Sequence, residues 1–131
     1  MAVLGALIGR SVPGLLLAAA VSLFMWDASW AGSEDEAYQH NRQGMISMGM
    51  ARFEEAIRSF RKASSLVEDY RIRGRKLEYT PIFHTGWASE KIGERAEACH
   101  AFERFLAVVP EDGADPTKIE HAEAFVQEHC H

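Results

Sequence analysis

The sequence predicts an all-α fold of about five helices that pack in antiparallel pairs. Apolar residues recur at intervals of three and four along residues 33–130, which is the spacing of one face of an α-helix. No stretch alternates apolar and polar residues as strands do, and Gly and Pro fall between the apolar stripes. The connections near residues 49–52, 93 and 110–115 are short, so consecutive helices should be antiparallel neighbours.

The first helix is expected over residues 33–49. The second is expected to follow Ala51 and Arg52 and to end near Tyr70. Ser33 and Glu36 have the spacing of a capping box, in which the two side chains satisfy backbone N–H groups at a helix start. One side of the first helix carries Ala37, Asn41, Gly44, Met45 and Met48. The apolar stripe of the second helix consists of Phe53, Ala56, Ile57, Phe60, Ala63 and Val67. Both patterns have the helical period.

Proline and glycine mark the limits of the third and fourth helices. Thr80 is expected as the N-cap of the third helix and Pro81 as its first residue, where the missing N–H is tolerated. Gly93 should end this helix in a left-handed conformation. The fourth helix covers about residues 94–108 and stops at Pro110. Its apolar face consists of Ala98, Phe102, Phe105 and Val109.

The fifth helix opens with Asp115 and Pro116 and extends to about residue 130. Its apolar side carries Ile119, Ala122, Val126 and His129. Between the second and third helices, residues 71–78 form a basic loop around Gly74. Its charges are Arg71, Arg73, Arg75 and Lys76. We expect a solvated loop; contact with an anionic lipid surface or an acidic partner is the alternative.

The composition indicates a small globular module. The chain has 131 residues, of which 47% are hydrophobic and 25% charged, as in ordinary one-domain proteins. The net charge of −5 argues against a generic nucleic-acid binder, which needs basic surface to neutralise phosphates. Two cysteines are too few for a scaffold held together by disulfides.

The N-terminus, residues 1–31, has the pattern of a secretory signal peptide. The apolar run from Leu15 to Trp26 is too short to span a bilayer and fits the central region of such a signal, with Arg10 as the preceding charge. Small residues before the expected cut favour cleavage after Ala31. These features predict export, which we assign to the bacterial periplasm.

An uncleaved N-terminus is the alternative. Residues 1–26 would then anchor the protein in the membrane, with the remaining domain facing the periplasm. In either case the folded part is expected to be residues 32–131. Contact with a membrane is expected only if the N-terminal segment is retained.

The helical region contains an internal repeat. A shift of 42 residues aligns residues 40–70 with residues 82–112, and six of the 31 positions are identical, where chance predicts about two. The identical pairs are Gly44/Gly86, Ser47/Ser89, Glu55/Glu97, Ala56/Ala98, Phe60/Phe102 and Val67/Val109. Each unit therefore reads Gly, eleven residues, then Ala-x-x-x-Phe.

This pattern resembles the tetratricopeptide repeat, a 34-residue helix–turn–helix unit. The resemblance implies an α-solenoid with one repeat over about residues 37–70, the basic loop over 71–78, a second repeat over about 79–112 and a capping helix over 115–130. The spacing of 42 departs from the family's 34 and places the extra residues in the basic loop. Serine also stands at positions 47 and 89, where the family usually has a large aromatic residue.

The resemblance also implies a concave face that binds a protein or peptide partner. Carried over by position, this face would hold Tyr38, Asn41, Met45, Met48, Phe83, Trp87, Glu90 and Lys91. Aromatic residues and Met are enriched at interfaces, although these side chains could instead fill the space between helix pairs. We therefore expect a non-catalytic interaction or assembly scaffold in the cell envelope. Self-association as a homodimer would be another way to cover the open end of a short repeat array.

The two cysteines carry the alternative function, a redox- or metal-responsive envelope protein. Antiparallel packing of the last two helices would bring Cys99 and Cys130 toward the same end, so they could form a disulfide or remain as two thiols. His129 and His131 are too few and too divergent for a metal site, and none is expected. No phosphate-binding loop or catalytic motif is present, so we expect neither enzyme activity nor a cofactor.

Overall fold

The computed structural model describes residues 32–131, in which all regular structure is helical and no strand occurs. The expected all-α fold is confirmed for this part of the chain. The predicted signal peptide, residues 1–31, and the alternative anchor, residues 1–26, lie outside the described residues. No helix within residues 32–131 is long and apolar enough to cross a membrane.

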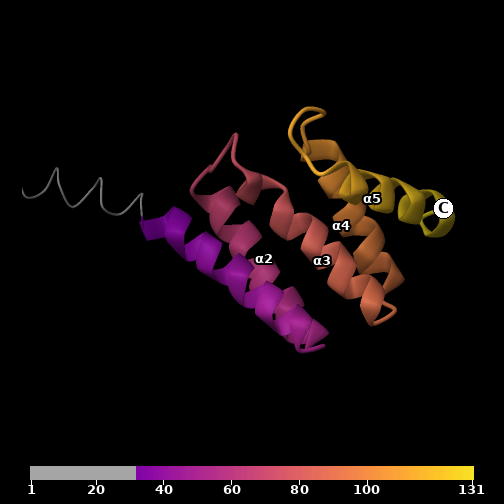
Figure 1. The fold of residues 1–131 in the computed structure, drawn as a ribbon, viewed down its shortest axis with the longest axis horizontal. Coiled ribbons are helices and arrows are strands. Elements are labelled where there is room, and N and C mark those ends of the chain that lie inside the picture. Colours follow the sequence, from indigo (N-terminus) through magenta and orange to yellow (C-terminus); the bar gives the residue numbers. More distant parts are fainter. Residues whose placement is uncertain (1–31) are drawn as a thin grey trace, which may run out of the picture. The chain divides into compact units, whose positions relative to one another are not determined.

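Five α-helices and one short 3₁₀-helix make up the described chain (Figure 1). They are residues 32–49, α2 (Phe53–Asp69), η1 (Lys76–Glu78), α3 (Thr80–Lys91), α4 (Arg95–Val108) and α5 (Pro116–His129). From α2 onward each α-helix packs against the next one, and the chain reverses direction at each connection. The helix of residues 32–49 lies alongside α2, which it contacts through Ala37.

The stripe that predicted α2 is the face that this helix buries. Ala56, Phe60 and Ala63 have no exposed surface, and Ile57 and Val67 are almost fully buried. On the preceding helix, Gly44 and Ala37 are buried, as the spacing predicts. Met45, from the same predicted side, is 40% exposed.

Two predicted helix starts are wrong. Gly32 is already helical, so Ser33 lies inside the first helix, where it is buried, and not at the N-cap position that the sequence predicts. Tyr79, rather than Thr80, is the N-cap of α3, and no side chain caps this helix. Tyr79 has helical backbone angles (φ −119°, ψ −26°) because η1 leads directly into α3.

The C-terminal end of α3 and the start of α5 follow the sequence signals. Gly93 has φ +76°, the left-handed conformation that glycine adopts without steric cost after a helix. Asp115 caps α5, since its carboxylate accepts a hydrogen bond from the Thr117 N–H at 3.0 Å. The expected capping residues are therefore found at these two helix ends, where no other helical segment leads directly into the helix.

The same glycine–phenylalanine contact holds both helix pairs. A Cβ at Gly86 would lie 2.8 Å from Cδ1 and Cε1 of Phe102, and a Cβ at Gly44 would overlap the ring of Phe60 in the same way. Carbon atoms in contact are normally about 3.5–4.0 Å apart, so only glycine permits this approach. Neither phenylalanine has exposed surface. The 42-residue internal similarity thus corresponds to a repeated packing contact.

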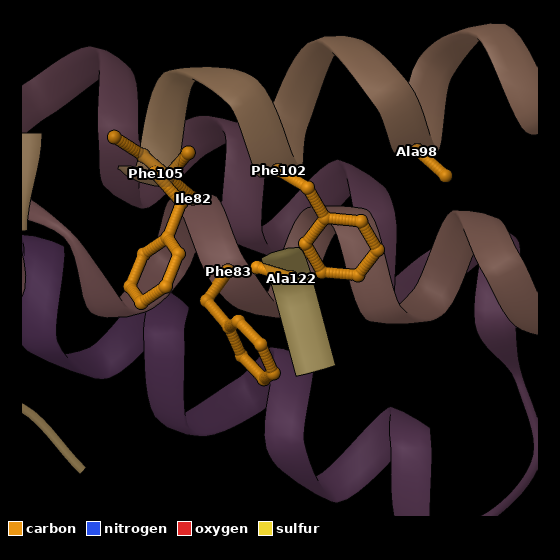
Figure 2. Packing of buried hydrophobic residues seen from close by; sticks show 6 residues of the cluster. All are labelled: Ile82, Phe83, Ala98, Phe102, Phe105 and Ala122. Carbon is orange, nitrogen blue, oxygen red and sulfur yellow. The ribbon is translucent and has the colours of Figure 1, made fainter. Parts of the chain in front are cut away.

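The largest core cluster joins α3, α4 and α5 (Figure 2). Its buried members are Ile82, Phe83, Ala98, Phe102, Phe105 and Ala122. Two smaller clusters lie around the first helix and α2: one includes Ala37 and Leu66, the other Phe60 and Ile57. Ala88 of α3 joins the second of these, so α3 is packed on both sides.

Two carboxylates hold the basic loop, one from within the loop and one from the first helix. Oε2 of Glu78 accepts a hydrogen bond from the Gly74 N–H at 3.0 Å, and Oε1 of the same carboxylate lies 3.8 Å from Nε of Arg73. Arg75 pairs with Glu34 of the first helix at 3.5 Å. These contacts, together with η1, give the predicted loop more local structure than its sequence indicated.

Candidate binding groove

A hollow of about 410 Å³ lies between the first helix, α3 and the start of α5. We call it the groove; its lining comes from segments far apart in the sequence. The lining residues are Met45, Phe83, His84, Trp87, Asp115, Thr117, Lys118 and His121. Three of them, Met45, Phe83 and Trp87, are among the residues that the sequence suggested for partner binding.

The floor of the groove is aromatic and is continuous with the core. Phe83 is only 6% exposed, and its ring centroid lies 5.6 Å from that of Phe102 and 5.2 Å from that of Phe105. Trp87 is half-buried and packs against the same cluster. Phe83 therefore stabilises the fold as well as forming the groove floor, whereas Trp87 keeps surface that a partner could contact.

The other first-helix residues suggested by sequence do not line the groove. Tyr38 is 55% exposed on the first helix, and Met48 packs against the cluster that contains Phe60. Asn41 is half-buried, and its Oδ1 lies 3.4 Å from Nδ1 of His84. Only Met45 of this helix lines the groove.

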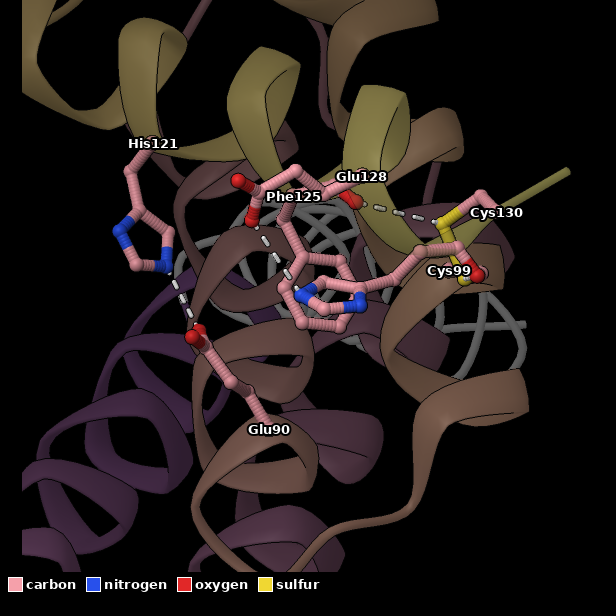
Figure 3. Close-up of polar contacts among 7 residues, drawn as sticks. Glu90, Cys99, His121, Phe125, Glu128 and Cys130 are labelled. Atoms are coloured by element: carbon pink, nitrogen blue, oxygen red, sulfur yellow. Dashed lines mark hydrogen bonds and ion pairs between the residues drawn. A yellow bond between two sulfur atoms is a disulfide. The ribbon is translucent and has the colours of Figure 1, made fainter.

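Glu90 and Lys91, also suggested by sequence, flank Trp87 at the end of α3. Glu90 Oε2 lies 2.6 Å from Nε2 of His121, a contact that bridges α3 and α5 (Figure 3). Lys91 Nζ lies 6.0 Å from the centroid of the Trp87 ring. Glu90 thus holds the capping helix in place, while Lys91 brings a positive charge to the aromatic surface.

The start of α5 adds groove residues that sequence reasoning missed. Lys118 Nζ lies 5.6 Å from the centroid of the Phe83 ring, at cation–π distance. Asp115 accepts hydrogen bonds from Thr117 through N–H and Oγ1, and these bonds lower the pKa of its carboxyl. No local pattern places α5 against α3, so the sequence could not associate Lys118 with the groove.

His84 is another groove residue that sequence reasoning missed, and it is neutral at physiological pH. The side chain is 5% exposed, with its ring centroid 5.0 Å from that of Phe60. Burial, with a smaller contribution from the positive charge of Lys118, lowers the pKa of His84 to about 4. Its repeat-equivalent position, residue 42, is an exposed arginine, so the internal alignment carried no signal for a buried histidine.

A disulfide fastens α5 to α4. Cys99 and Cys130 are bonded with a Cα–Cα distance of 5.6 Å, the pairing that the sequence raised beside two free thiols (Figure 3). Phe125 packs nearby on Phe102 at 5.1 Å between ring centroids. Because Asp115, Lys118 and His121 all lie on or next to α5, the disulfide helps to hold one wall of the groove.

The opposite face of the helix pairs is braced by ion pairs. Arg61 pairs with Glu97, and Arg104 pairs with Glu68, in each case between α2 and α4. These residues line a hollow of about 260 Å³. Each arginine there already has a carboxylate partner, so this hollow offers little to a charged ligand.

No protein-family model, curated protein or solved structure matches this chain. Within residues 32–131, no group of three or more His, Cys, Asp or Glu side chains is arranged to hold a metal ion. The tetratricopeptide resemblance therefore rests on the internal residue pattern of the sequence alone.

Proposed function

We propose that residues 32–131 form a non-catalytic protein–protein interaction module. The module consists of two divergent tetratricopeptide-like units, at about residues 37–70 and 79–112, followed by a capping helix. It binds a protein or peptide partner in the groove and serves as an assembly scaffold. The observation that carries this proposal is the groove itself, in which apolar side chains from the first helix and α3 meet α5.

The repeated packing contact supports the repeat assignment. In both helix pairs a glycine lets the two helices approach closely at a phenylalanine ring. These contacts are Gly44 with Phe60 and Gly86 with Phe102. Two such pairs in series leave the first helix of each pair on one side, where a helical or extended segment can lie across them. Met45 and Trp87 are partly exposed apolar side chains on that side, and both line the groove.

The disulfide supports a place outside the cytoplasm. The Cys99–Cys130 bond is consistent with an oxidising, extracytoplasmic compartment, because disulfides rarely persist in the cytosol. We propose that residues 1–31 direct export to the bacterial periplasm. If residues 1–26 are retained, the same module would act as a membrane-tethered adaptor.

In-cell photo-crosslinking tests the proposal. A photoreactive residue at position 45 or 87 should capture the same protein repeatedly, with the product identified by mass spectrometry. Position 108, where Val108 is 38% exposed but lies outside the groove, is the matched control. Capture of a second copy would identify the groove as a homodimer surface. Equal products from all three positions, or none from a folded protein, would refute a binding role for the groove.

A further inference from the structure

The groove combines an aromatic floor with one lysine in its lining, Lys118, and a second lysine, Lys91, lies next to it beside Trp87. Lys118 Nζ lies 5.6 Å from the centroid of the Phe83 ring, and Lys91 Nζ lies 6.0 Å from that of the Trp87 ring. Among the described residues, neither ammonium group has a carboxylate within ion-pair distance. A partner that brings carboxylates to this surface would therefore gain contacts that the domain itself does not make.

Two carboxylates in or beside the groove already have other partners. Glu90 contacts His121 at 2.6 Å, and Asp115 accepts two hydrogen bonds from Thr117, at 3.0 Å and 2.7 Å. The charge of Lys118 reaches both neighbours in the groove, since it lowers the pKa of His84 as well as that of Asp115. The groove lining thus carries a negative charge at Asp115 and a positive charge at Lys118 beside a neutral His84. Within the described residues the Asp115 carboxylate is hydrogen-bonded by Thr117, whereas the Lys118 ammonium has no carboxylate partner and can pair with an incoming one.

The two lysines differ from the arginines on the opposite face of the helix pairs. The whole chain has a net charge of −5. On the opposite face, Arg61 and Arg104 are each paired with a glutamate. What distinguishes Lys91 and Lys118 is that each ammonium group lies over an aromatic ring at the groove or beside it, where both groups complement an acidic segment.

We propose that the groove binds an acidic segment of a partner protein. A large apolar side chain of that segment would rest on Phe83 and Trp87, and flanking Asp or Glu residues would pair with Lys91 and Lys118. The apolar contact supplies most of the affinity, and the charges provide selectivity and faster association. This inference rests on the proposed function and specifies the chemistry of the partner.

Selection from a random library of short peptides tests the proposal on the full-length protein as isolated from cells. Peptides enriched on the wild type should carry Asp or Glu next to an aromatic or large aliphatic residue. Binding of the enriched peptides is then measured by fluorescence anisotropy against variants. Lys91→Gln with Lys118→Gln should weaken binding roughly fivefold to tenfold at low salt, and added salt should reduce the difference.

Two sets of variants serve as controls. Lys62→Gln with Lys76→Gln changes the net charge equally at exposed lysines that have no ion pair in the described residues, and binding should stay within about twofold of wild type. The neutral variants Met45→Gln and Trp87→Leu report on the groove itself and should weaken binding. Circular dichroism verifies that each variant is folded.

The outcomes separate the two proposals. The enriched peptides could be neutral or basic and lose affinity for Met45→Gln or Trp87→Leu but not for the paired lysine substitutions. That result would overturn the proposal of an acidic partner and leave the groove as the binding site. Peptides that bind the groove variants as well as wild type, or the absence of any enrichment, would overturn both.

Discussion

Substituting alanine for Gly86 tests the contact that both helix pairs share. The new Cβ would lie 2.8 Å from two ring carbons of Phe102, about 0.7 Å inside ordinary contact distance. Phe102 has no exposed surface and is surrounded by Phe83 and Phe125, so its ring cannot turn aside freely. Overpacking of this kind costs about 1–3 kcal/mol.

A second glycine separates packing from helix propensity. Replacing Gly by Ala inside a helix stabilises it by up to about 1 kcal/mol, which partly offsets the clash at residue 86. Gly49 is also helical and has no atom within 4 Å of a Cβ placed on it, so Gly49→Ala changes propensity without a clash. The difference between the two variants should therefore be about 1–3 kcal/mol in the free energy of unfolding.

Urea denaturation followed by circular dichroism measures this difference. For a domain of this size, about 2 kcal/mol corresponds to a midpoint shift of roughly 1.5–2 M urea at constant slope. Gly44→Ala should behave like Gly86→Ala, since it meets Phe60 in the same way. If Gly86→Ala is as stable as Gly49→Ala, the close helix approach is not a requirement of the fold, and the explanation of the repeat fails.

Three further predictions concern His84 and the disulfide. The free energy of unfolding should fall by about 2 kcal/mol between pH 7.5 and pH 5 through His84, because its pKa is near 6.5 when unfolded and about 4 when folded, so only the unfolded state takes up the proton. Lys118→Gln should raise the folded-state pKa of His84, measured by NMR titration of the ring, since it removes a nearby positive charge. Replacing both Cys99 and Cys130 by Ser should cost about 3.7 kcal/mol, the chain-entropy value for a separation of 31 residues, measured by urea denaturation.

Each of these expectations has its own control. His84→Gln should remove the extra pH dependence, and a wild type with the same pH profile as this variant would contradict the burial argument. An unchanged pKa of His84 in Lys118→Gln would leave desolvation as its sole cause. Thiol labelling of the unreduced, denatured wild type should find no label on Cys99 or Cys130; two labels would mean that the disulfide does not form in the cell.

Local spacing determined much of the fold. The stripe of α2, the left-handed Gly93 and the Asp115 cap depend on residues a few positions apart, so their period and turn chemistry are readable from the sequence. The shift of 42 residues likewise identified Gly44 and Gly86 as places of close approach. These features are set by backbone geometry within one or two helices.

Contacts between distant segments were decided only in three dimensions. The start of α3 moved by one residue because η1 continues into it, and Phe83 is both core and groove floor because α4 and α5 pack around it. Lys118 reaches the groove because α5 folds back onto α3 through the core and the contact between His121 and Glu90. The periodicity of one helix specifies which face is apolar, but the partner of that face depends on how all the helices pack.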